Sequence, residues 1–304
     1  MNVLLVAEEA AGIQVLRLLA SNGHRVAAVL TAPPQTGGGA TVAGVADGLG
    51  VPVLPSQLVR DPALAHLLRL QEVDLLLNVH SLYVIHGDVL AACRIGAFNM
   101  HPGPLPQYAG LNAPSWAIYN GEPRHAVTIH WMEPGIDTGA VAYSTSFEIA
   151  DDDTGLSLSA KCVRSGLQLV AELLEAAARG KRAIPAERQD VSARRYYDRK
   201  TVPQDGRIVW SAPGRQVVDL VRASDYGPFP SPWGRPRARL DGQELTVLRA
   251  VRTHEPTSEP PGTIGPPAGP AARVATADEW ILLERVAPRE AGAALRPGTR
   301  LADG

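Results

Sequence analysis

The sequence predicts an α/β protein with a Rossmann-like, mostly parallel sheet and a smaller β-rich, OB-like barrel at the C-terminal end. Three observations lead to this prediction. Short apolar runs alternate with helical patterns in the first half of the chain, as they do in βαβ units. After about Gly206 the segments become short and are bounded by glycine, proline or Asp-Gly. The length of 304 residues is sufficient for about two domains.

The first half of the chain alternates between strand and helix patterns. Val3–Val6 is a continuous apolar run, which is typical of a strand buried on both faces. Ile13, Leu16 and Leu19 then share one helical face, and Asn22-Gly23 ends that helix. Similar patterns predict strands at 26–30, 51–54, 74–79, 97–100, 127–132 and 140–145, and helices at 43–49, 64–70, 113–119 and 154–178.

The second half is expected to be mainly β. The patterns predict one helix at 216–223 and strands at 237–240, 245–250, 262–264 and 280–286. Asp241-Gly242 is a hairpin signal between the first two of these strands. The Pro- and Gly-rich stretch 256–270 predicts a mobile surface loop, and residues from about Ala291 are expected to be loosely held. We therefore expect two domains, 1–203 and 204–304, the second a partly open barrel.

Composition restricts the class of protein. With 45% hydrophobic and 20% charged residues, the chain has the balance of a folded protein rather than a disordered one. Its 29 Lys+Arg and 31 Asp+Glu residues give a net charge of -2, which argues against binding of nucleic acid or an anionic membrane by overall charge. No apolar run approaches the roughly 18 residues of a membrane span, and the acidic start does not resemble a signal peptide. A soluble, cytoplasmic protein is expected.

Familiar cofactor and metal motifs are missing from the sequence. Cys93 and Cys162 are the only cysteines, so neither a disulfide scaffold nor a thiolate zinc site is expected. The histidines match no common zinc spacing, and His130, between two apolar residues, is predicted to be a packed strand residue. Residues 7–12 read AEEAAG rather than GxGxxG, and no GxxxxGK[ST] occurs. Dinucleotide, P-loop and metal sites are therefore not expected.

Polar residues concentrate between Phe98 and Gly139. Asn99 and His101 are two residues apart at the end of a predicted strand, so they point to the same side, and Asp137 follows in a glycine-flanked turn. An amide, an imidazole and a carboxylate suit acyl transfer to an amine. N–H groups stabilise the oxyanion, and the carboxylate orients the imidazole and helps to remove the amine proton. A structural role for Asn99 and His101, with Asp137 as a turn former, is the alternative that spacing alone leaves open.

The segments FNMHPGPLPQYAG and DTGA carry a more specific likeness. Together they resemble the signature of the formyltransferases that use 10-formyltetrahydrofolate: Asn-x-His near a strand end, Leu-Pro-x-Tyr-x-Gly, and then Asp-x-Gly. The resemblance continues through 199–200, 208–210, 221–223 and 228–232, and covers roughly residues 1–250. Within this family the chain is most similar to the formyltransferase portion of a bifunctional enzyme that acts on a UDP-linked 4-amino sugar.

The resemblance implies roles for individual residues. The catalytic residues would be Asn99, His101 and Asp137. The folate pterin would bind in a pocket lined by His80, Ser81, Leu82, Tyr83, Val84 and Ile85, and completed by Gly135 and Gly139. Contacts to the substrate would come from Gly103, Pro104, Tyr108, Gly110 and Arg199, with bracing of the loop as the alternative for Tyr108. Many family members have Ser-Leu-Leu-Pro where this chain has Gly103-Pro104-Leu105-Pro106, so the choice of substrate is harder to predict than the catalytic residues.

The sequence thus predicts an N-formyltransferase that moves a formyl group from 10-formyltetrahydrofolate, without a metal, to the amine of a small substrate. A nucleotide-linked amino sugar and an amine of specialised metabolism are the expected acceptors. Methionyl-tRNA ranks below them, because residues 31–41 contain no Lys or Arg and residues 204–304 hold 13 Arg against 12 Asp+Glu. A formyltetrahydrofolate hydrolase and a non-catalytic folate-binding module are further alternatives. The oligomeric state is open, with a homodimer as one alternative.

Overall fold

The computed structural model describes residues 1–33, 39–81, 83–288 and 295–304. The chain forms two compact units that interleave along the sequence. The first unit comprises Met1–Gly110, Ala126–Phe147 and Lys161–Tyr196, and the second comprises Leu111–His125, Glu148–Ala160 and Tyr197–Gly304. The division into 1–203 and 204–304 remains a prediction from the sequence.

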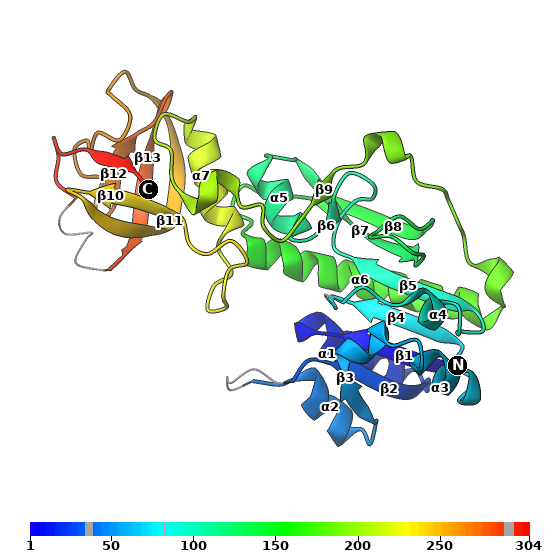
Figure 1. Cartoon of the computed structure of the whole chain (residues 1–304). Coiled ribbons are helices and arrows are strands. Elements are labelled where there is room, and N and C mark those ends of the chain that lie inside the picture. Colours follow the sequence, from blue (N-terminus) through cyan, green and yellow to red (C-terminus); the bar gives the residue numbers. More distant parts are fainter. Residues whose placement is uncertain (34–38, 82, 289–294) are drawn as a thin grey trace. The chain divides into compact units, whose positions relative to one another are not determined.

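A seven-stranded, mostly parallel sheet forms the first unit, in the order β3-β2-β1-β4-β5-β7-β8 (Figure 1). Its strands are β1 (Asn2–Ala7), β2 (Arg25–Thr31), β3 (Val53–Pro55), β4 (Leu75–Val79), β5 (Gly96–His101), β7 (Arg124–Trp131) and β8 (Val141–Glu148). Parallel pairing joins β1 to β2 and β4, β2 to β3, and β4 to β5, whereas β5 and β7 are antiparallel. Every residue of β4 is buried, which explains its run of three leucines, and Asn78 is its one polar residue.

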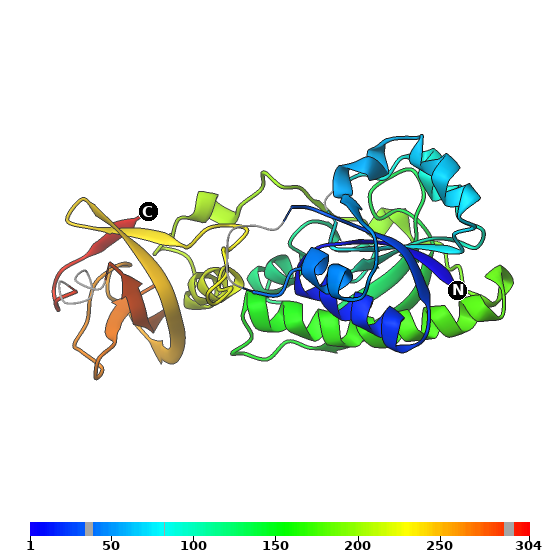
Figure 2. The same ribbon diagram turned by 90° about the horizontal axis from the view of Figure 1, so that it is seen from below.

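Helices cover both faces of this sheet (Figure 2). The helices are α1 (Glu9–Ser21), α2 (Val42–Gly48) and α6 (Gly155–Ala178) on one face, and α3 (Leu64–Leu70) and α4 (Gly87–Leu90) on the other. Leu5 and its register partner Leu77 pack toward α1 and α6, and the adjacent pair Leu4 and Leu76 pack toward α3 and α4. This alternation within β1 and β4 confirms the predicted doubly covered α/β sheet.

The second unit contains an antiparallel, curled five-stranded sheet in the order β12-β13-β11-β10-β14. The strands are β10 (Arg237–Leu240), β11 (Gln243–Pro256), β12 (Ala272–Ala275), β13 (Glu279–Ala287) and β14 (Leu301–Asp303), and the helices of this unit include α5 (Ala113–Tyr119) and α7 (Gly214–Ala223). The register of β11 against β13 shifts at three places, and such irregularities bend a strand strongly (Figure 1). The predicted β-rich half-barrel is confirmed.

Several local predictions for this unit are wrong. Residues 262–264 form only isolated bridges, through Thr263 and Ile264, rather than a strand. The strand predicted at 245–250 does form, but it is longer than predicted, because β11 extends over Gln243–Pro256. The end of the chain, expected to be loose, contains β14, which pairs with β10 and buries Leu301. Both β12 and β14 are short and owe their pairing to distant partners, which a local pattern does not reveal.

Candidate active site

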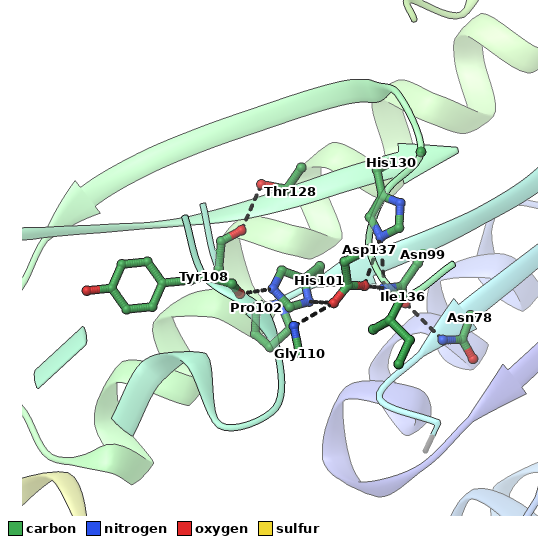
Figure 3. A network of polar contacts seen from close by, with 12 residues as sticks. Asn78, Asn99, His101, Pro102, Tyr108, Gly110, Thr128, His130, Ile136 and Asp137 are labelled. Atoms are coloured by element: carbon green, nitrogen blue, oxygen red, sulfur yellow. Dashed lines mark hydrogen bonds and ion pairs between the residues drawn. The ribbon is translucent and has the colours of Figure 1, made fainter. Parts of the chain in front are cut away.

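The three residues predicted to be catalytic meet beside the end of β5 (Figure 3). Asn99 and His101 are alternate residues of this strand, so their side chains lie on the same side. Asp137 lies in the turn after β7, with a left-handed backbone (φ +54°). The exposed fractions of Asn99, His101 and Asp137 are 9%, 3% and 9%. The structure thus brings the predicted residues together in a buried setting.

Asp137 is at the centre of the contacts. Its Oδ1 lies 3.3 Å from Asn99 Nδ2, and its Oδ2 lies 3.6 Å from His101 Nδ1. Oδ2 also accepts a 2.8 Å hydrogen bond from the backbone N–H of Gly110. His101 Nε2 lies 2.6 Å from the carbonyl oxygen of Tyr108. Since a carbonyl oxygen only accepts, Nε2 carries the hydrogen there, and Nδ1 is the nitrogen that faces the carboxylate.

The turn that carries Asp137 is held by two side chains to which the sequence did not point. Gln189 Nε2 donates to the carbonyl oxygens of Asp137 and Gly139, at 2.9 Å and 2.6 Å. Arg194 donates to the carbonyl oxygen of Ile136 at 2.8 Å. A left-handed aspartate persists only when its surroundings hold it, and these bonds to the turn supply that support.

Two buried neighbours extend the network, and neither was predicted. Asn78 Nδ2 donates to Asn99 Oδ1 at 2.9 Å. His130 Nε2 lies 3.1 Å from Asn99 Nδ2 and 3.3 Å from Asp137 Oδ1. Asn78 and His130 are the register partners of Asn99 on β4 and β7. His130 is the packed strand residue that the sequence predicts. Its contacts with Asn99 and Asp137 were not predicted, because its partner across the sheet depends on a register that the sequence does not reveal.

The protonation states of the central pair follow from burial and from these contacts. Burial lowers the pKa of His101 below its ordinary value, although the charge of Asp137 opposes the shift. Burial by itself raises the pKa of Asp137. The charge of His101, the contact with His130 and the N–H of Gly110 outweigh burial and hold that pKa well below its usual range. At neutral pH Asp137 is therefore a carboxylate beside a neutral His101.

The residues predicted to line a pterin pocket lie on two loops of the first unit. His80 and Ser81 follow β4, and His80 has a left-handed backbone (φ +61°) with Nδ1 3.6 Å from Glu9 Oε2. Tyr83 and Val84 are exposed and Ile85 is buried, while Leu82 lies outside the described residues. His80 Nε2, Ser81 Oγ and Thr138 Oγ1, the last between the predicted Gly135 and Gly139, are buried and have no hydrogen-bond partner among the residues that the structure describes. These atoms could bind a polar ligand.

The residues predicted to contact the substrate mostly brace the loop after β5. The carbonyl oxygen of Gly103 accepts from Thr128 Oγ1 at 2.8 Å, and that of Pro104 accepts from the N–H of Tyr108 at 2.9 Å. Tyr108 is only 3% exposed, and its ring points away from Asp137 (Figure 3). Gly110 binds Asp137, as described. Arg199 is exposed and belongs to the second unit, so its contact with a substrate stays a prediction.

Metal-binding clusters and membrane-spanning helices are both missing from the described part of the chain. Over residues 1–33, 39–81, 83–288 and 295–304, no group of three or more histidine, cysteine or acidic side chains has an arrangement that could hold a metal ion. Over the same ranges, none of the helices combines the length and the apolar character needed to cross a membrane.

Comparisons with known proteins identify the family. The family model described as formyl transferase matches residues 2–174, and the one described as formyl transferase, C-terminal domain, matches residues 200–295. Methionyl-tRNA formyltransferase of Anaeromyxobacter sp. (strain K) is 32% identical over 270 residues, which cover 86% of this chain and 83% of that protein.

Solved structures share the fold. The N-formyltransferase from Helicobacter canadensis, in complex with folinic acid and dTDP-3-aminofucose, has a TM-score of 0.71 at 16% identity, covering 92% of this chain and 98% of that one. HypX from Aquifex aeolicus, in complex with tetrahydrofolic acid, has a TM-score of 0.64 at 20% identity, covering 94% of this chain and 44% of that one. With both of its domain models matched and a relative covered over most of its length, this chain is a member of the formyl transferase family.

Proposed function

We propose that this formyltransferase moves the formyl group of 10-formyltetrahydrofolate to the amine of a small substrate. The observation that carries the proposal is the buried, ionised Asp137, which contacts both the Asn99 amide and the neutral His101 ring. Transfer of a formyl group to an amine needs a hydrogen-bond donor for the developing oxyanion and an acceptor for the amine proton. The Asn99 amide is such a donor, and the Asp137 carboxylate is such an acceptor.

The amine proton has a defined destination in this arrangement. His101 Nε2 is occupied by the Tyr108 carbonyl, so the unprotonated Nδ1 and the carboxylate Oδ2 of Asp137 face each other across 3.6 Å. Two acceptors at this separation can hold a proton between them, and its arrival draws them together. A donor role for His101 toward the formyl oxygen would require the ring to leave one of these partners, so we assign that role to Asn99 Nδ2.

The loops after β4 and β7 fit a folate. His80 Nε2, Ser81 Oγ and Thr138 Oγ1 are buried and have no hydrogen-bond partner among the described residues, and a pteridine carries donors and acceptors that could pair with them. 10-Formyltetrahydrofolate would supply the electrophilic formyl carbon. The structures of relatives in complex with folinic acid or tetrahydrofolic acid support this choice of donor.

Charge in the second unit favours a small acceptor over tRNA. Among the residues that the structure describes between 204 and 304, seven arginines form ion pairs with acidic residues: Arg215, Arg222, Arg235, Arg237, Arg249, Arg252 and Arg273. An arginine whose charge is balanced by a neighbouring carboxylate attracts a phosphate backbone less strongly. The dTDP-3-aminofucose of the Helicobacter complex agrees with a nucleotide-linked amino sugar as the acceptor. The Anaeromyxobacter relative is a methionyl-tRNA formyltransferase, so methionyl-tRNA remains the second candidate.

Release of tetrahydrofolate from 10-formyltetrahydrofolate, measured with a panel of acceptors, tests the proposal. The panel holds UDP- and dTDP-linked amino sugars, free amino acids and methionyl-tRNA, each at low and high salt. We expect release that depends on one small amine and changes little with salt. Release that requires methionyl-tRNA and falls steeply with salt would favour the second candidate, because each phosphate contact adds to the salt dependence.

The same assay separates the remaining alternatives. Release without any acceptor would indicate a hydrolase, with water in the position of the amine. Binding of the folate without release under any condition would indicate a folate-binding module. Either result would overturn the proposed function.

A further inference from the structure

His130 is a buried member of the polar network around Asp137. It is 2% exposed and occupies the position on β7 opposite Asn99 on β5. Figure 3 shows its ring above Asp137 and Asn99. A buried imidazole between an amide and a carboxylate restricts the orientation of both, because each buried polar atom must find a partner.

The tautomer of His130 follows from its contacts. Nδ1 lies 2.8 Å from the carbonyl oxygen of Trp131, so the ring hydrogen is on Nδ1. In the neutral ring Nε2 is then an acceptor. It lies 3.1 Å from Asn99 Nδ2, which donates to it, and 3.3 Å from Asp137 Oδ1.

These distances determine where the hydrogens of Asn99 can point. Asn99 Nδ2, His130 Nε2 and Asp137 Oδ1 form a nearly equilateral triangle, with sides of 3.1, 3.3 and 3.3 Å. The angle at each corner of this triangle is smaller than the angle between the two N–H bonds of a planar amide. Only one hydrogen of Nδ2 can therefore point into the triangle, and the other must leave it.

The opposite end of the amide is held as well. Asn78 Nδ2 donates to Asn99 Oδ1 at 2.9 Å, which prevents the amide from turning over. Asn78 and His130 thus hold Asn99 from two sides, through strands β4 and β7. Among the residues that the structure describes, Asn99 Nδ2 contacts only His130 and Asp137, so the hydrogen that leaves the triangle can donate to a formyl oxygen.

We propose that His130 is a positioning residue for formyl transfer: as a hydrogen-bond acceptor, its Nε2 orients the Asn99 amide so that one N–H points to the formyl oxygen. This inference rests on the proposed function. Without this acceptor, Asn99 Nδ2 would keep only its 3.3 Å contact with Asp137 Oδ1, and the direction of the N–H that leaves the triangle would be less closely defined. The turnover number should suffer more than binding, because an oxyanion donor acts mainly in the transition state.

Three variants test this role. His130→Phe removes the acceptor, and we expect kcat to fall on the order of 10²-fold with KM changed only a few-fold. His130→Gln places an amide oxygen near the position of Nε2, and we expect it to recover much of the lost kcat. His125→Phe is the matched control, since His125 is 1% exposed at the other end of the same strand. It should retain kcat near that of the wild type.

A measurement independent of turnover accompanies the kinetics. In ¹⁵N-histidine NMR spectra, with His130 assigned by its loss in His130→Gln, we expect the neutral Nδ1–H tautomer. The inference is overturned by the Nε2–H tautomer, by His130→Phe with the kcat of the wild type, or by His130→Gln as slow as His130→Phe. If the wild type transfers no formyl group to any acceptor, the proposed function fails, and the NMR spectrum still decides whether Nε2 is the acceptor.

Discussion

Replacing Asp137 with asparagine separates the chemistry of the site from its shape. The amide has nearly the same size as the carboxylate, so an oxygen can still accept from the N–H of Gly110, at present a 2.8 Å bond. The charge is lost, however, and with it the acceptor for the amine proton. An –NH₂ group would face either Asn99 Nδ2 or His130 Nε2 in place of Oδ1. The substitution therefore removes a function while leaving most of the packing.

The two effects of Asp137→Asn differ greatly in size. A positioned acid or base contributes typically ~10²–10⁴-fold to the rate, and we expect kcat to fall by that amount. Stability should change little. Burial lowers the pKa of His101, so this ring stays neutral without its partner and no unpaired charge is buried. Weaker hydrogen bonds at one site cost about 1–2 kcal/mol of unfolding free energy.

The assay combines turnover with equilibrium unfolding. Tetrahydrofolate release is followed with the acceptor found for the wild type, and urea unfolding gives the free energy of each variant. Asp190→Asn is the control, because Asp190 is an exposed aspartate of the same compact unit that caps a short helix. A stably folded Asp137→Asn enzyme with kcat within a few-fold of the wild type would refute the assignment of Asp137.

Three further predictions concern neighbouring residues. Asn99→Ala removes the proposed oxyanion donor and should lower kcat by ~10²–10³-fold, while the dissociation constant of the folate, measured by calorimetry, stays nearly unchanged. Burial lowers the pKa of His101, so below about pH 6.5 the unfolded chain binds a proton that the folded chain does not. The free energy of unfolding should therefore decrease as the pH is lowered. Urea unfolding of His101→Gln at neutral and mildly acidic pH should show a weaker fall, whereas the exposed control His66→Gln should keep the slope of the wild type, and equal slopes for both would contradict this. Gly139→Ala would place a Cβ against the carbonyl oxygen of Trp131 and should destabilise the protein by ~1–3 kcal/mol, while Gly48→Ala in helix α2, with open space around the added carbon, should not lower the melting temperature.

The elements that the sequence predicts well are those whose burial is complete. Strands β1 and β4 are rich in leucine and valine because both of their faces are covered, and α6 has a long amphipathic pattern. Strands β12 and β14 are different, since they have four and three residues and bury few side chains. Their existence depends on pairing with β13 and β10, and pairing between distant segments is not encoded in local composition.

The candidate site also contains some residues that the sequence predicts and others that it does not. Asn99, His101 and Asp137 could be predicted, because their residue types and spacing match a chemistry and a family signature. Asn78 and His130 could not, because their roles depend on the register of three strands, and the turn contacts of Gln189 depend on how a later segment packs. A signal did exist for His130: a polar residue between the apolar Ile129 and Trp131 of a strand needs a partner when it is buried.

The most direct test of the central claim follows the formyl group itself. 10-Formyltetrahydrofolate carrying a ¹³C-labelled formyl group is incubated with the enzyme and the acceptor found in the panel, and the acceptor is examined by NMR and mass spectrometry. We predict that the wild type places the label on the acceptor nitrogen in equal amount to the tetrahydrofolate released, and that Asp137→Asn does neither. Labelled formate in solution, with no label on the acceptor, would contradict formyl transfer by this site.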